Sequence, residues 1–276
     1  VFASRPVTGE DFSSLYPSIM MAYNLSPEKI VLTLAELEII KAKYPGIKYK
    51  EYSFMYNNRL VQAWSILHEN VEQNIGLYPK ILIGLFNQRA SMKKVLKLHE
   101  STQEILEKII SSSYKAVYDE FKAIVDDTSE IVVPIGKTME EMVKYRASLV
   151  SDAKESLKIL ESFTSTDYKD LLKHNEVKFN AINTKQKALK IFMNTFYGEA
   201  GNGNSPLFLL EHAGGVTCLG QYNIKLVKGF VESQRYTIKY GDTDSLYVSP
   251  PNDVYEMIDI EYLTGKLTLI DYWTGM

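Results

Sequence analysis

The stretch YGDTDS at residues 240–245 joins two runs, 235–240 and 245–248, that alternate like strands. Alternation around a tight turn rich in Gly and Asp predicts a β-hairpin with two carboxylates at its tip. Residues i and i+2 of a strand share a face, so Asp242 and Asp244 could approach one cation, and Mg²⁺ prefers such oxygen ligands. The alternative is an ordinary polar turn, in which Asp and Gly are common.

A third carboxylate, Asp11, opens the stretch DFSSLYPS at residues 11–18 and follows an extended run. A carboxylate at a strand end, beside backbone N–H groups and serine hydroxyls, could bind a metal while the turn holds phosphate. Asp and Ser also suit an ordinary helix N-cap, which is the alternative. Pro17 fixes its own φ and disfavours the helical conformation of Tyr16, which predicts a compact turn followed by a helical run over 18–23.

Residues 78–98 carry apolar side chains at helical spacing and predict a long helix. Its predicted buried side consists of Ile81, Leu82, Leu85, Met92 and Leu96. Arg89 and Lys93 are four residues apart, so they project from one face of this helix, and Lys97 continues the line. A solvated cationic surface is the usual meaning of such charges.

Residues 185–197 predict another helix, which ends at Gly198. One face of this helix carries a polar stripe at i, i+4 and i+7 that consists of Lys190, Asn194 and Tyr197. The stripe is expected to point away from Leu189, Phe192 and Phe196. A Lys, an Asn and a Tyr on one face suit contacts to phosphate, sugar and base edges, and a solvated face is again the alternative.

Two smaller patterns predict further local elements. Thr138 and Glu141 have the spacing of a capping box and predict the start of a helix. Residues 131–134 predict a short extended piece. The four histidines show no metal-ligand spacing and are interpreted as surface or satisfied core residues: His68, His99, His174 and His212.

Composition bounds the answer without deciding it. The 276 residues are enough for a sizeable core, and the single cysteine, Cys218, excludes an internal disulfide. No apolar run is long enough to predict a membrane span. The net charge of −3 does not by itself suggest nucleic acid, because proteins that grip nucleic acid usually carry a basic surface.

Taken in order, these stretches resemble the family B DNA polymerases. Residues 11–18 resemble motif A of that family, residues 190–198 (KIFMNTFYG) its motif B, and residues 240–245 its motif C. Residues 77–82, which lead into the cationic face described above, resemble the first helix of its fingers. The resemblance spans most of the chain and is weakest over 99–180.

The resemblance implies an α+β fold, with a polymerase palm of antiparallel sheet and helices plus a helical fingers subdomain. We expect residues 1–75 to form the first part of the palm, 76–200 the fingers helices and 201–276 the second part of the palm, truncated before the thumb. The thumb and the exonuclease region would lie outside this chain. We therefore expect a piece of a longer protein that binds DNA poorly alone and whose activity alone is open.

The resemblance implies two Mg²⁺ ions, for which Mn²⁺ can substitute, between the palm strands. Asp11 and Asp244 would be their ligands, with Asp242 beside them as a weaker or transient one. The carbonyl of Phe12 is a further candidate ligand. In the two-metal scheme, one ion activates the primer 3′-hydroxyl and the other binds the triphosphate and the leaving pyrophosphate.

The resemblance also implies which residues bind the incoming nucleotide. Arg89, Lys93 and Lys190 would bind it from the fingers, with Arg forking onto phosphate oxygens and Lys acting as a point charge. Closure of the fingers around a paired nucleotide would assemble these groups.

The opposite side of the nucleotide would be held by motif A. Ser14, with the backbone N–H groups of Leu15 and Tyr16, would bind phosphate oxygens. The ring of Tyr16 would lie under the sugar as a steric gate against a 2′-hydroxyl, or serve as a core aromatic. Asn194 and Tyr197 would line the nascent base pair.

The implied partners are a DNA primer–template and dNTPs, with accessory or processivity subunits unidentified and no membrane. The implied location is intracellular, at a site of DNA replication in a nucleus or a viral replication site. Two positions depart from the family pattern. Glu10 stands where an apolar strand residue is usual and could face away from the site or perturb it, and Gln221 stands where many relatives have Arg.

Three alternatives remain at this point. A degenerate polymerase-like domain that binds nucleic acid without catalysis is disfavoured by the intact Asp11, Asp242 and Asp244. A helix-rich interaction protein would require every motif to be a coincidence. Synthesis of RNA is disfavoured by Tyr16, because a bulky ring there should exclude ribose.

Overall fold

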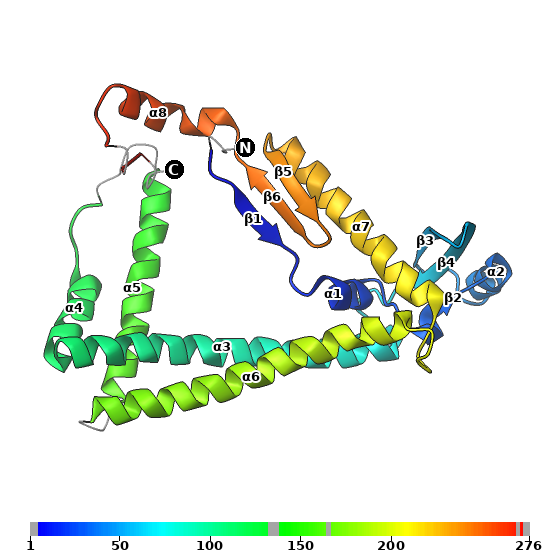
Figure 1. The fold of residues 1–276 in the computed structure, drawn as a ribbon, viewed down its shortest axis with the longest axis horizontal. Helices are drawn as coiled ribbons and strands as arrows, with labels where there is room; N and C mark the ends of the chain where they lie inside the picture. The colour runs from blue at the N-terminus through cyan, green and yellow to red at the C-terminus, as the bar shows by residue number, and fades with distance from the viewer. Residues whose placement is uncertain (1–4, 132–137, 164–166, 269–270, 273–276) are drawn as a thin grey trace. The chain divides into compact units, whose positions relative to one another are not determined.

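The computed structural model describes residues 5–131, 138–163, 167–268 and 271–272. These residues form helices and two small antiparallel sheets (Figure 1), which confirms the mixed α+β class. The chain divides into two compact units, which we call unit 1 (Val1–Gln88 with Leu189–Met276) and unit 2 (Arg89–Ala188). The assignment of the names palm and fingers to residue ranges stays a prediction.

Unit 1 contains all the strands that the described residues form. Its elements are β1 (Thr8–Asp11), α1 (Leu15–Ala22), the 3-10 turn Pro27–Lys29, β2 (Ile30–Val31), α2 (Leu34–Lys43), β3 (Tyr49–Tyr56), β4 (Arg59–Ile66), the 3-10 turn Glu72–Asn74, α7 (Leu210–Ser233), β5 (Thr237–Asp242), β6 (Ser245–Ser249), the 3-10 turn Asn252–Tyr255 and α8 (Glu256–Leu263). Unit 2 contains α4 (Tyr114–Asp126) and α5 (Met139–Glu161). The two long helices α3 (Leu77–Ser111) and α6 (Tyr168–Gly201) each run through both units.

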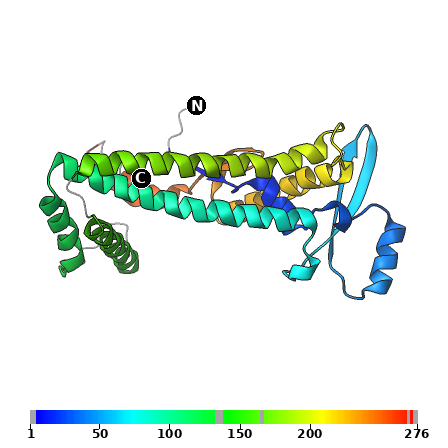
Figure 2. The same cartoon turned by 90° about the horizontal axis from the view of Figure 1, so that it is seen from below.

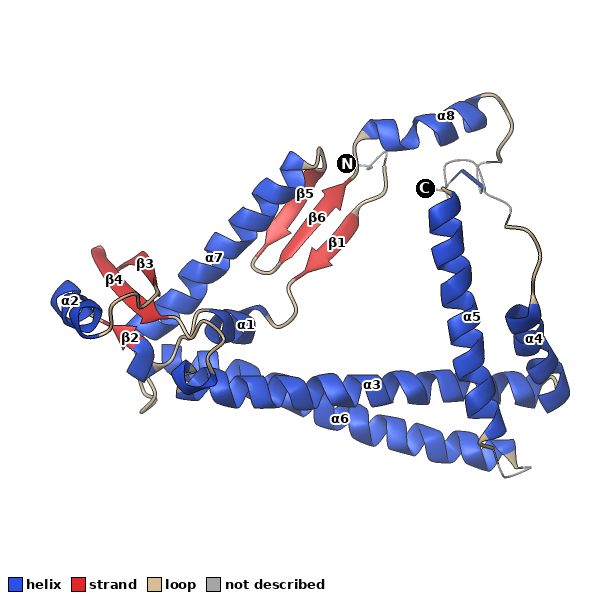
Figure 3. Ribbon diagram, turned by 180° about the vertical axis from the view of Figure 1, so that it is seen from behind, coloured by secondary structure: helices blue, strands red, loops and turns tan. Residues whose placement is uncertain are grey.

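The first sheet has the strand order β1-β6-β5, so the last hairpin of the chain pairs with its first strand (Figure 3). The predicted hairpin over 235–248 is confirmed, with Asp242 paired to Ser245 across a two-residue turn. The register shifts between Ile238 and Tyr240, where β5 contains a bulge. On β6, Leu246 is buried, and α7 contacts both β5 and β6.

The second sheet has the order β2-β4-β3, and α2 packs on it through a small apolar cluster of Val31, Leu37 and Trp64. Figure 2 shows α2 in blue beside these strands. Its β3–β4 hairpin turns at Asn57 and Asn58, whose φ values are 47° and 59°. Asn tolerates this left-handed conformation better than most residues, so the Asn pair specifies the turn. This hairpin was not among the elements predicted above.

The helix that follows Asp11 corrects the prediction for Tyr16 and Pro17. Both residues lie in the first turn of α1, which begins at Leu15, and not in a separate turn before it. Proline is tolerated in the first turn of a helix, where its missing N–H has no intrahelical acceptor. The bias that Pro17 places on Tyr16 is therefore overridden by packing, because Leu15 and Pro17 are buried.

The predicted helix over 78–98 exists and is longer than expected, since α3 runs to Ser111. Leu82 and Leu96 are buried as predicted, and Leu85 packs against the core. Ile81 is exposed, which the prediction had wrong. Its neighbour Leu82 is fully buried in the core of unit 1.

The predicted helix over 185–197 is also part of a longer element. Gly198 is helical rather than terminal, because α6 ends at Gly201. The core-facing positions of its last turns are Met193, Phe196, Tyr197 and Ala200, at i, i+3, i+4 and i+7. The expected apolar face was therefore wrong in part, since Phe192 is exposed and Tyr197 lies on the core side.

The capping box of Thr138 and Glu141 is confirmed at the start of α5, with both reciprocal hydrogen bonds present. The extended piece predicted over 131–134 lies, after Ile131, outside the described residues. Within unit 2, α3 and α6 are joined side by side, because the side-chain amide of Asn175 donates to the carbonyl of His99 at 2.9 Å. No helix among the described ranges is long and apolar enough to cross a membrane.

The main core of unit 1 joins α1, the second sheet, α7, the start of α3 and the end of α6. Its buried members are Leu15, Ile19, Met20, Leu25, Ile30, Tyr52, Ala63, Tyr78, Leu82, Met193, Val216 and Leu219. A separate cluster in unit 2 consists of Ile105, Ile109, Val117, Ile159 and Leu160. The residues that follow Asp11 are therefore held by the core that also anchors α3 and α6.

Candidate functional site

Two of the predicted carboxylates meet at one hydroxyl group. β1 pairs with β6 so that Asp11 lies directly opposite Ser245. The Ser245 hydroxyl lies 2.9 Å from Asp11 Oδ1 and 3.4 Å from Asp244 Oδ1, within donating distance of both carboxylates. The backbone adds a second link, because the N–H of Phe12 donates to the carbonyl of Asp244 at 2.8 Å. The sheet thus brings Asp11 and Asp244 together from opposite ends of the chain.

Asp242 lies on the other side of Ser245. It is the last residue of β5 and, like Asp11, is the direct partner of Ser245 in the ladder. Its Oδ1 accepts a hydrogen bond of 3.0 Å from the hydroxyl of Thr243. Directly opposed residues of antiparallel strands point to the same face, so Asp11, Ser245 and Asp242 form a row across the sheet.

The turn between Asp242 and Ser245 is strained. Thr243 has φ = 47°, a left-handed conformation that is unfavourable for a β-branched residue. Strain of this kind costs roughly 1–3 kcal/mol and is often found at functional sites. The strained Thr243 places Asp244 in the turn rather than on a strand, so the two acids of the hairpin do not share a strand face as the i, i+2 spacing suggested.

Glu10 points away from the row of acids. It is paired with Leu246 in the ladder, one position from the Asp11–Ser245 pair, and successive strand residues alternate between faces. Of the two expectations for Glu10, the one in which it faces away holds. Gln221 is exposed on α7.

The segment after Asp11 turns sharply into α1. Ser14 has φ = 53° and ψ = 59°, so the chain reverses there before Leu15 begins the helix. The N–H groups of Leu15 and Tyr16 belong to the first turn of α1, where backbone donors lack intrahelical acceptors. The hydroxyl of Ser18 donates to the carbonyl of Ser13 at 2.8 Å and tightens the reversal.

Tyr16 meets Tyr197 across the core of unit 1. Their ring centroids are 4.3 Å apart and the rings are stacked. Burial first, and then the neighbouring Tyr16, raises the pKa of the Tyr197 phenol. On the same helix, Lys190 and Asn194 are exposed. The structure therefore brings Tyr16 and Tyr197 together and leaves the two polar residues on the surface.

Arg89 and Lys93 belong to unit 2. The guanidinium Nε of Arg89 donates to Oε1 of Gln186 at 3.2 Å, which ties α3 to α6 within that unit. Lys93 is exposed on α3.

The donor set around Asp11 and Asp244 consists of oxygen atoms. Carboxylates and a neighbouring carbonyl, that of Phe12, are the ligands that Mg²⁺ and Mn²⁺ prefer, so the residues present fit a divalent ion chemically. Over the described ranges of the chain, no three His, Cys, Asp or Glu side chains form a ready metal-binding group. Sequence reasoning missed Ser245, although its place directly after Asp244 in motif C was a usable signal.

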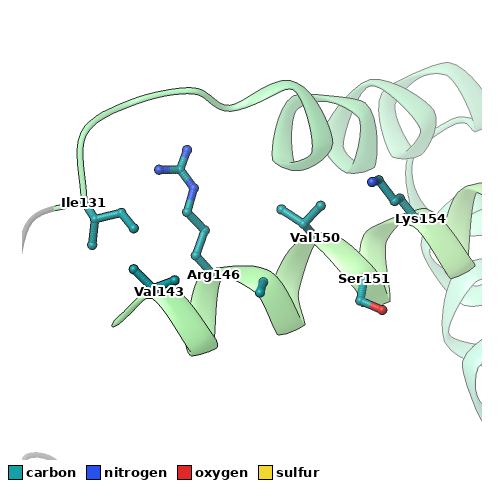
Figure 4. A pocket seen from close by; sticks show the side chains of 7 residues that line it. Ile131, Val143, Arg146, Val150, Ser151 and Lys154 are labelled. Carbon is teal, nitrogen blue, oxygen red and sulfur yellow. The ribbon is translucent and has the colours of Figure 1, made fainter. Parts of the chain in front are cut away.

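Unit 2 also contains an open groove. It runs along α5 between Ile131 and Lys154, and Val143, Arg146 and Val150 line it (Figure 4). Arg146 already donates to the backbone carbonyls of Asp127 and Ser129. The groove holds none of the residues predicted above to bind metal or nucleotide.

Comparison with known proteins decides the family. The sequence profile described as DNA polymerase family B matches residues 2–118 and 122–260. The chain belongs to DNA polymerase family B. The match includes Asp11, Asp242 and Asp244, so the row of acids lies inside the family region.

Three relatives of this family B chain come from two viruses and a bacteriophage. It is 39% identical over 97% of its length to the protein named DNA polymerase beta from African swine fever virus, and 26% identical over 98% to the DNA polymerase of Pyramimonas orientalis virus. It is 25% identical over 98% to the DNA-directed DNA polymerase of Enterobacteria phage T4. The chain spans 17%, 20% and 28% of the lengths of these relatives.

Among solved structures, the family B DNA polymerase from the hyperthermophilic archaeon Pyrobaculum calidifontis matches 95% of this chain and 22% of its own, with 19% identity and a TM-score of 0.35. The assignment to family B rests on the sequence matches.

Proposed function

We propose that this chain forms part of the catalytic core of a template-directed DNA polymerase that adds dNTPs to a primer 3′-hydroxyl. The observation that carries the proposal is the position of Asp11 and Asp244, both within hydrogen-bonding distance of the Ser245 hydroxyl. Asp11 ends β1, Asp244 lies in the turn between β5 and β6, and the helix after Asp11 begins with backbone donors that lack intrahelical acceptors. Carboxylates beside an anion-binding helix start are the parts that phosphoryl transfer needs, because its catalysis is mainly positioning and charge neutralisation.

Asp11 and Asp244 would hold two divalent ions, with the Phe12 carbonyl as a further ligand and Asp242 as a weaker one. Two carboxylates at this separation repel each other, and a cation relieves that repulsion. When bound, the ions would supply charge neutralisation and activation of the attacking hydroxyl in an in-line displacement. Mg²⁺ is the expected ion, and Mn²⁺ is a substitute.

The other residues would position the nucleotide. Ser14 and the N–H groups of Leu15 and Tyr16 would hold phosphate oxygens at the start of α1, while Arg89, Lys93 and Lys190 would bind the triphosphate. Tyr16 would exclude a 2′-hydroxyl, and Asn194 with Tyr197 would line the base pair. These roles rest on the match to the family motifs.

The reaction balances without a protein nucleophile. The oxygen of the primer 3′-hydroxyl forms a bond to the α-phosphorus, and its proton passes to a water molecule. The bond between that phosphorus and the bridging oxygen breaks, and pyrophosphate leaves with the electron pair. The chain therefore needs acceptors for metal and donors for phosphate, which its motifs supply.

The proposal extends to organisation and partners. We assign residues 1–75 and 201–276 to a palm and 76–200 to fingers, as parts of a longer polymerase. Its substrates would be a primer–template and dNTPs at an intracellular site of DNA replication.

Primer extension with Mg²⁺ and dNTPs tests the proposal in the full-length protein that contains this chain. Asp11→Ala and Asp244→Ala are compared with Glu10→Ala, which removes a carboxylate beside Asp11 that faces away from the row. We expect both Asp variants to lose extension and Glu10→Ala to retain it. Absence of extension by the unaltered protein, when it is folded and binds primer–template, would instead favour a non-catalytic nucleic-acid-binding domain.

A further inference from the structure

The loop between α1 and β2 contains buried polar side chains that form hydrogen bonds with residues far away in the sequence. Asn24 and Ser26 are fully buried. The Asn24 side-chain amide donates to the carbonyls of Ile66 at 2.8 Å and Asn74 at 3.0 Å, and its Oδ1 accepts from the N–H of Gly76 at 2.7 Å. Three hydrogen bonds repay the desolvation of this buried amide, so its place is tightly specified.

The same loop caps the N-terminus of α3. Glu28 Oε1 accepts from the N–H of Leu77 at 2.6 Å, and Ser26 Oγ accepts from the N–H of Tyr78 at 3.2 Å. Ser26 Oγ in turn donates to Glu28 Oε2 at 2.6 Å. Three consecutive backbone donors at the start of α3, from Gly76 to Tyr78, are thus accepted by side chains about fifty residues earlier.

Gly76 allows the capping loop to approach the start of α3 closely. A side chain at this position would place its Cβ 2.6 Å from Ser26 Cβ and 3.1 Å from Glu28 Oε1, so only glycine admits the loop. Burial alone would raise the pKa of Glu28, but the hydrogen bonds from Ser26 and Leu77 lower it overall. Glu28 is therefore an anion at neutral pH, which the positive end of the helix dipole favours.

The loop also contacts α7, and the helix start that it caps contacts α6 and α7. The carbonyl of Leu25 accepts from Nε2 of His212 on α7 at 3.1 Å. Tyr78, capped by Ser26, contacts the rings of His212 and of Phe196 on α6, with centroids 5.6 Å and 5.5 Å away. One short loop directly after α1 therefore fixes the start of α3 against α6 and α7 within unit 1.

We propose that Asn24, Ser26 and Glu28 are positioning residues for the incoming nucleotide, because they hold the start of α3, from which Tyr78 packs against Phe196 of motif B. Tyr197, the next residue of motif B, stacks on Tyr16 of motif A, and all these rings belong to the main core of unit 1. A shift of Tyr78 would therefore displace the two rings that motifs A and B bring together, and a misplacement of about 1 Å can cost about 100-fold in rate. This inference rests on the proposed function of Tyr16 and Tyr197.

The test measures single-nucleotide incorporation in the full-length protein, with KM for dNTP, kcat and the Kd for primer–template determined separately. Glu28→Ala removes the acceptor for Leu77, and Glu28→Gln keeps an oxygen there. We expect Glu28→Ala to raise KM for dNTP by about 10-fold or more without changing the Kd for primer–template, and Glu28→Gln to recover most of the loss. Ser26→Ala, a smaller deletion, should raise the same KM in the same direction.

A matched control separates positioning from stability. Thr33 caps α2 in unit 1 by accepting from the N–H of Glu36 at 3.2 Å, so Thr33→Ala loses a helix cap that is not on α3. We expect Thr33→Ala to lower Tm and leave KM for dNTP unchanged.

Extension by the unaltered protein, with KM for dNTP unchanged in Glu28→Ala and Ser26→Ala, would overturn this inference alone. An increase of KM in Thr33→Ala as large as that in Glu28→Ala would overturn it as well. No extension by the unaltered protein would overturn the proposed function and, with it, this inference.

Discussion

The rings of Tyr16 and Tyr197 stack with their centroids 4.3 Å apart and their planes 28° from parallel. Tyr16 lies in the first turn of α1 and Tyr197 near the end of α6, so the stack joins motif A to motif B inside one core. Stacked aromatic pairs contribute about 0.5–1.5 kcal/mol beyond their buried area. Each ring therefore restricts the rotamers of the other, and this packing holds the ring of Tyr16 in place.

A fixed ring at Tyr16 predicts selection against ribonucleotides. We expect Tyr16→Ala to lower the preference for dNTP over rNTP by about 10- to 100-fold, because removal of the ring makes room for a 2′-hydroxyl. Tyr16→Phe keeps the ring and should keep the preference. The measurement is the ratio of kcat/KM for the two nucleotides in the full-length protein, and an unchanged ratio in Tyr16→Ala would contradict the prediction.

The hydroxyl of Ser245 predicts a change in metal requirement. It lies within donating distance of Asp11 Oδ1 and Asp244 Oδ1, so its loss would free both carboxylates to turn. Partners that orient metal ligands typically contribute about 10- to 100-fold in metal affinity or activity. We expect Ser245→Ala to raise the Mg²⁺ concentration for half-maximal extension by about 10-fold and Ser245→Thr, which keeps a hydroxyl, to restore it. Equal Mg²⁺ curves for all three proteins would argue against a role for this hydroxyl.

Two glycines of α7 predict opposite changes in stability. A Cβ on Gly215 would lie 2.7 Å from the ring of the buried Tyr52, whereas a Cβ on Gly229 would meet no described atom within 4 Å. Alanine gains roughly 1 kcal/mol over glycine in a helix, but overpacking a core costs about 1–3 kcal/mol. We expect Gly229→Ala to raise the free energy of unfolding and Gly215→Ala to lower it. Urea titrations check the signs, and stabilisation by both changes would mean that Tyr52 yields easily.

The buried His212 predicts a loss of stability in acid. Its Nε2 donates to Leu25, and within the described structure Nδ1 has no hydrogen-bond partner, so the neutral ring is the stable form. Burial lowers the pKa of His212 to about 4. Below about pH 6.5 the unfolded chain binds a proton that the folded chain does not, so stability falls towards pH 4 by roughly 3 kcal/mol.

The control for this prediction is His212→Gln, which does not titrate. Carboxylates contribute acid sensitivity to both proteins, so the difference between their unfolding free energies isolates the histidine. That difference should be constant above about pH 6.5 and shrink below it. Parallel curves from about pH 7 to pH 4 would show that His212 is not the titrating group. All four histidines were interpreted as surface or satisfied core residues. His212 departs from that interpretation, because its buried Nδ1 has no hydrogen-bond partner in the described structure.

The sequence was informative where local rules act. The capping box of Thr138 and Glu141 and the hairpin around Asp242 appear as predicted, since each depends on residues a few positions apart. The 24-residue helix α7 was not among the predicted elements, and glycines inside it lower its helix propensity. Two of them, Gly214 and Gly215, lie against the rings of Phe54 and Tyr52 on β3, so packing overrides propensity there.

The sequence predicts the residues of the candidate site, but it does not predict how they are arranged in space. Asp11 and Asp244 were both named from motifs, but their meeting at Ser245 depends on a strand pairing between the two ends of the chain. The caps on α3 were beyond sequence reasoning for the same reason, since Glu28 and Leu77 are far apart in the chain. Local patterns identify the residues, and long-range pairing decides which of them act together.

The bulge in β5 adds one residue to that strand that has no partner on β6. Ile238 is opposite Val248 while Tyr240 is opposite Tyr247, so one extra residue exchanges the two faces of the strand from that point on. Val248 is buried, and Asp242 beyond the bulge emerges beside Ser245 and Asp11. Removal of the unpaired residue, Lys239, would leave Ile238 opposite Val248 and Asp242 opposite Ser245 in a regular ladder, and would remove the local bend and extra twist that the bulge adds. Relatives of this chain that lack the extra residue should therefore keep Asp242 beside Ser245 and differ in how sharply the hairpin twists before it reaches the row of acids.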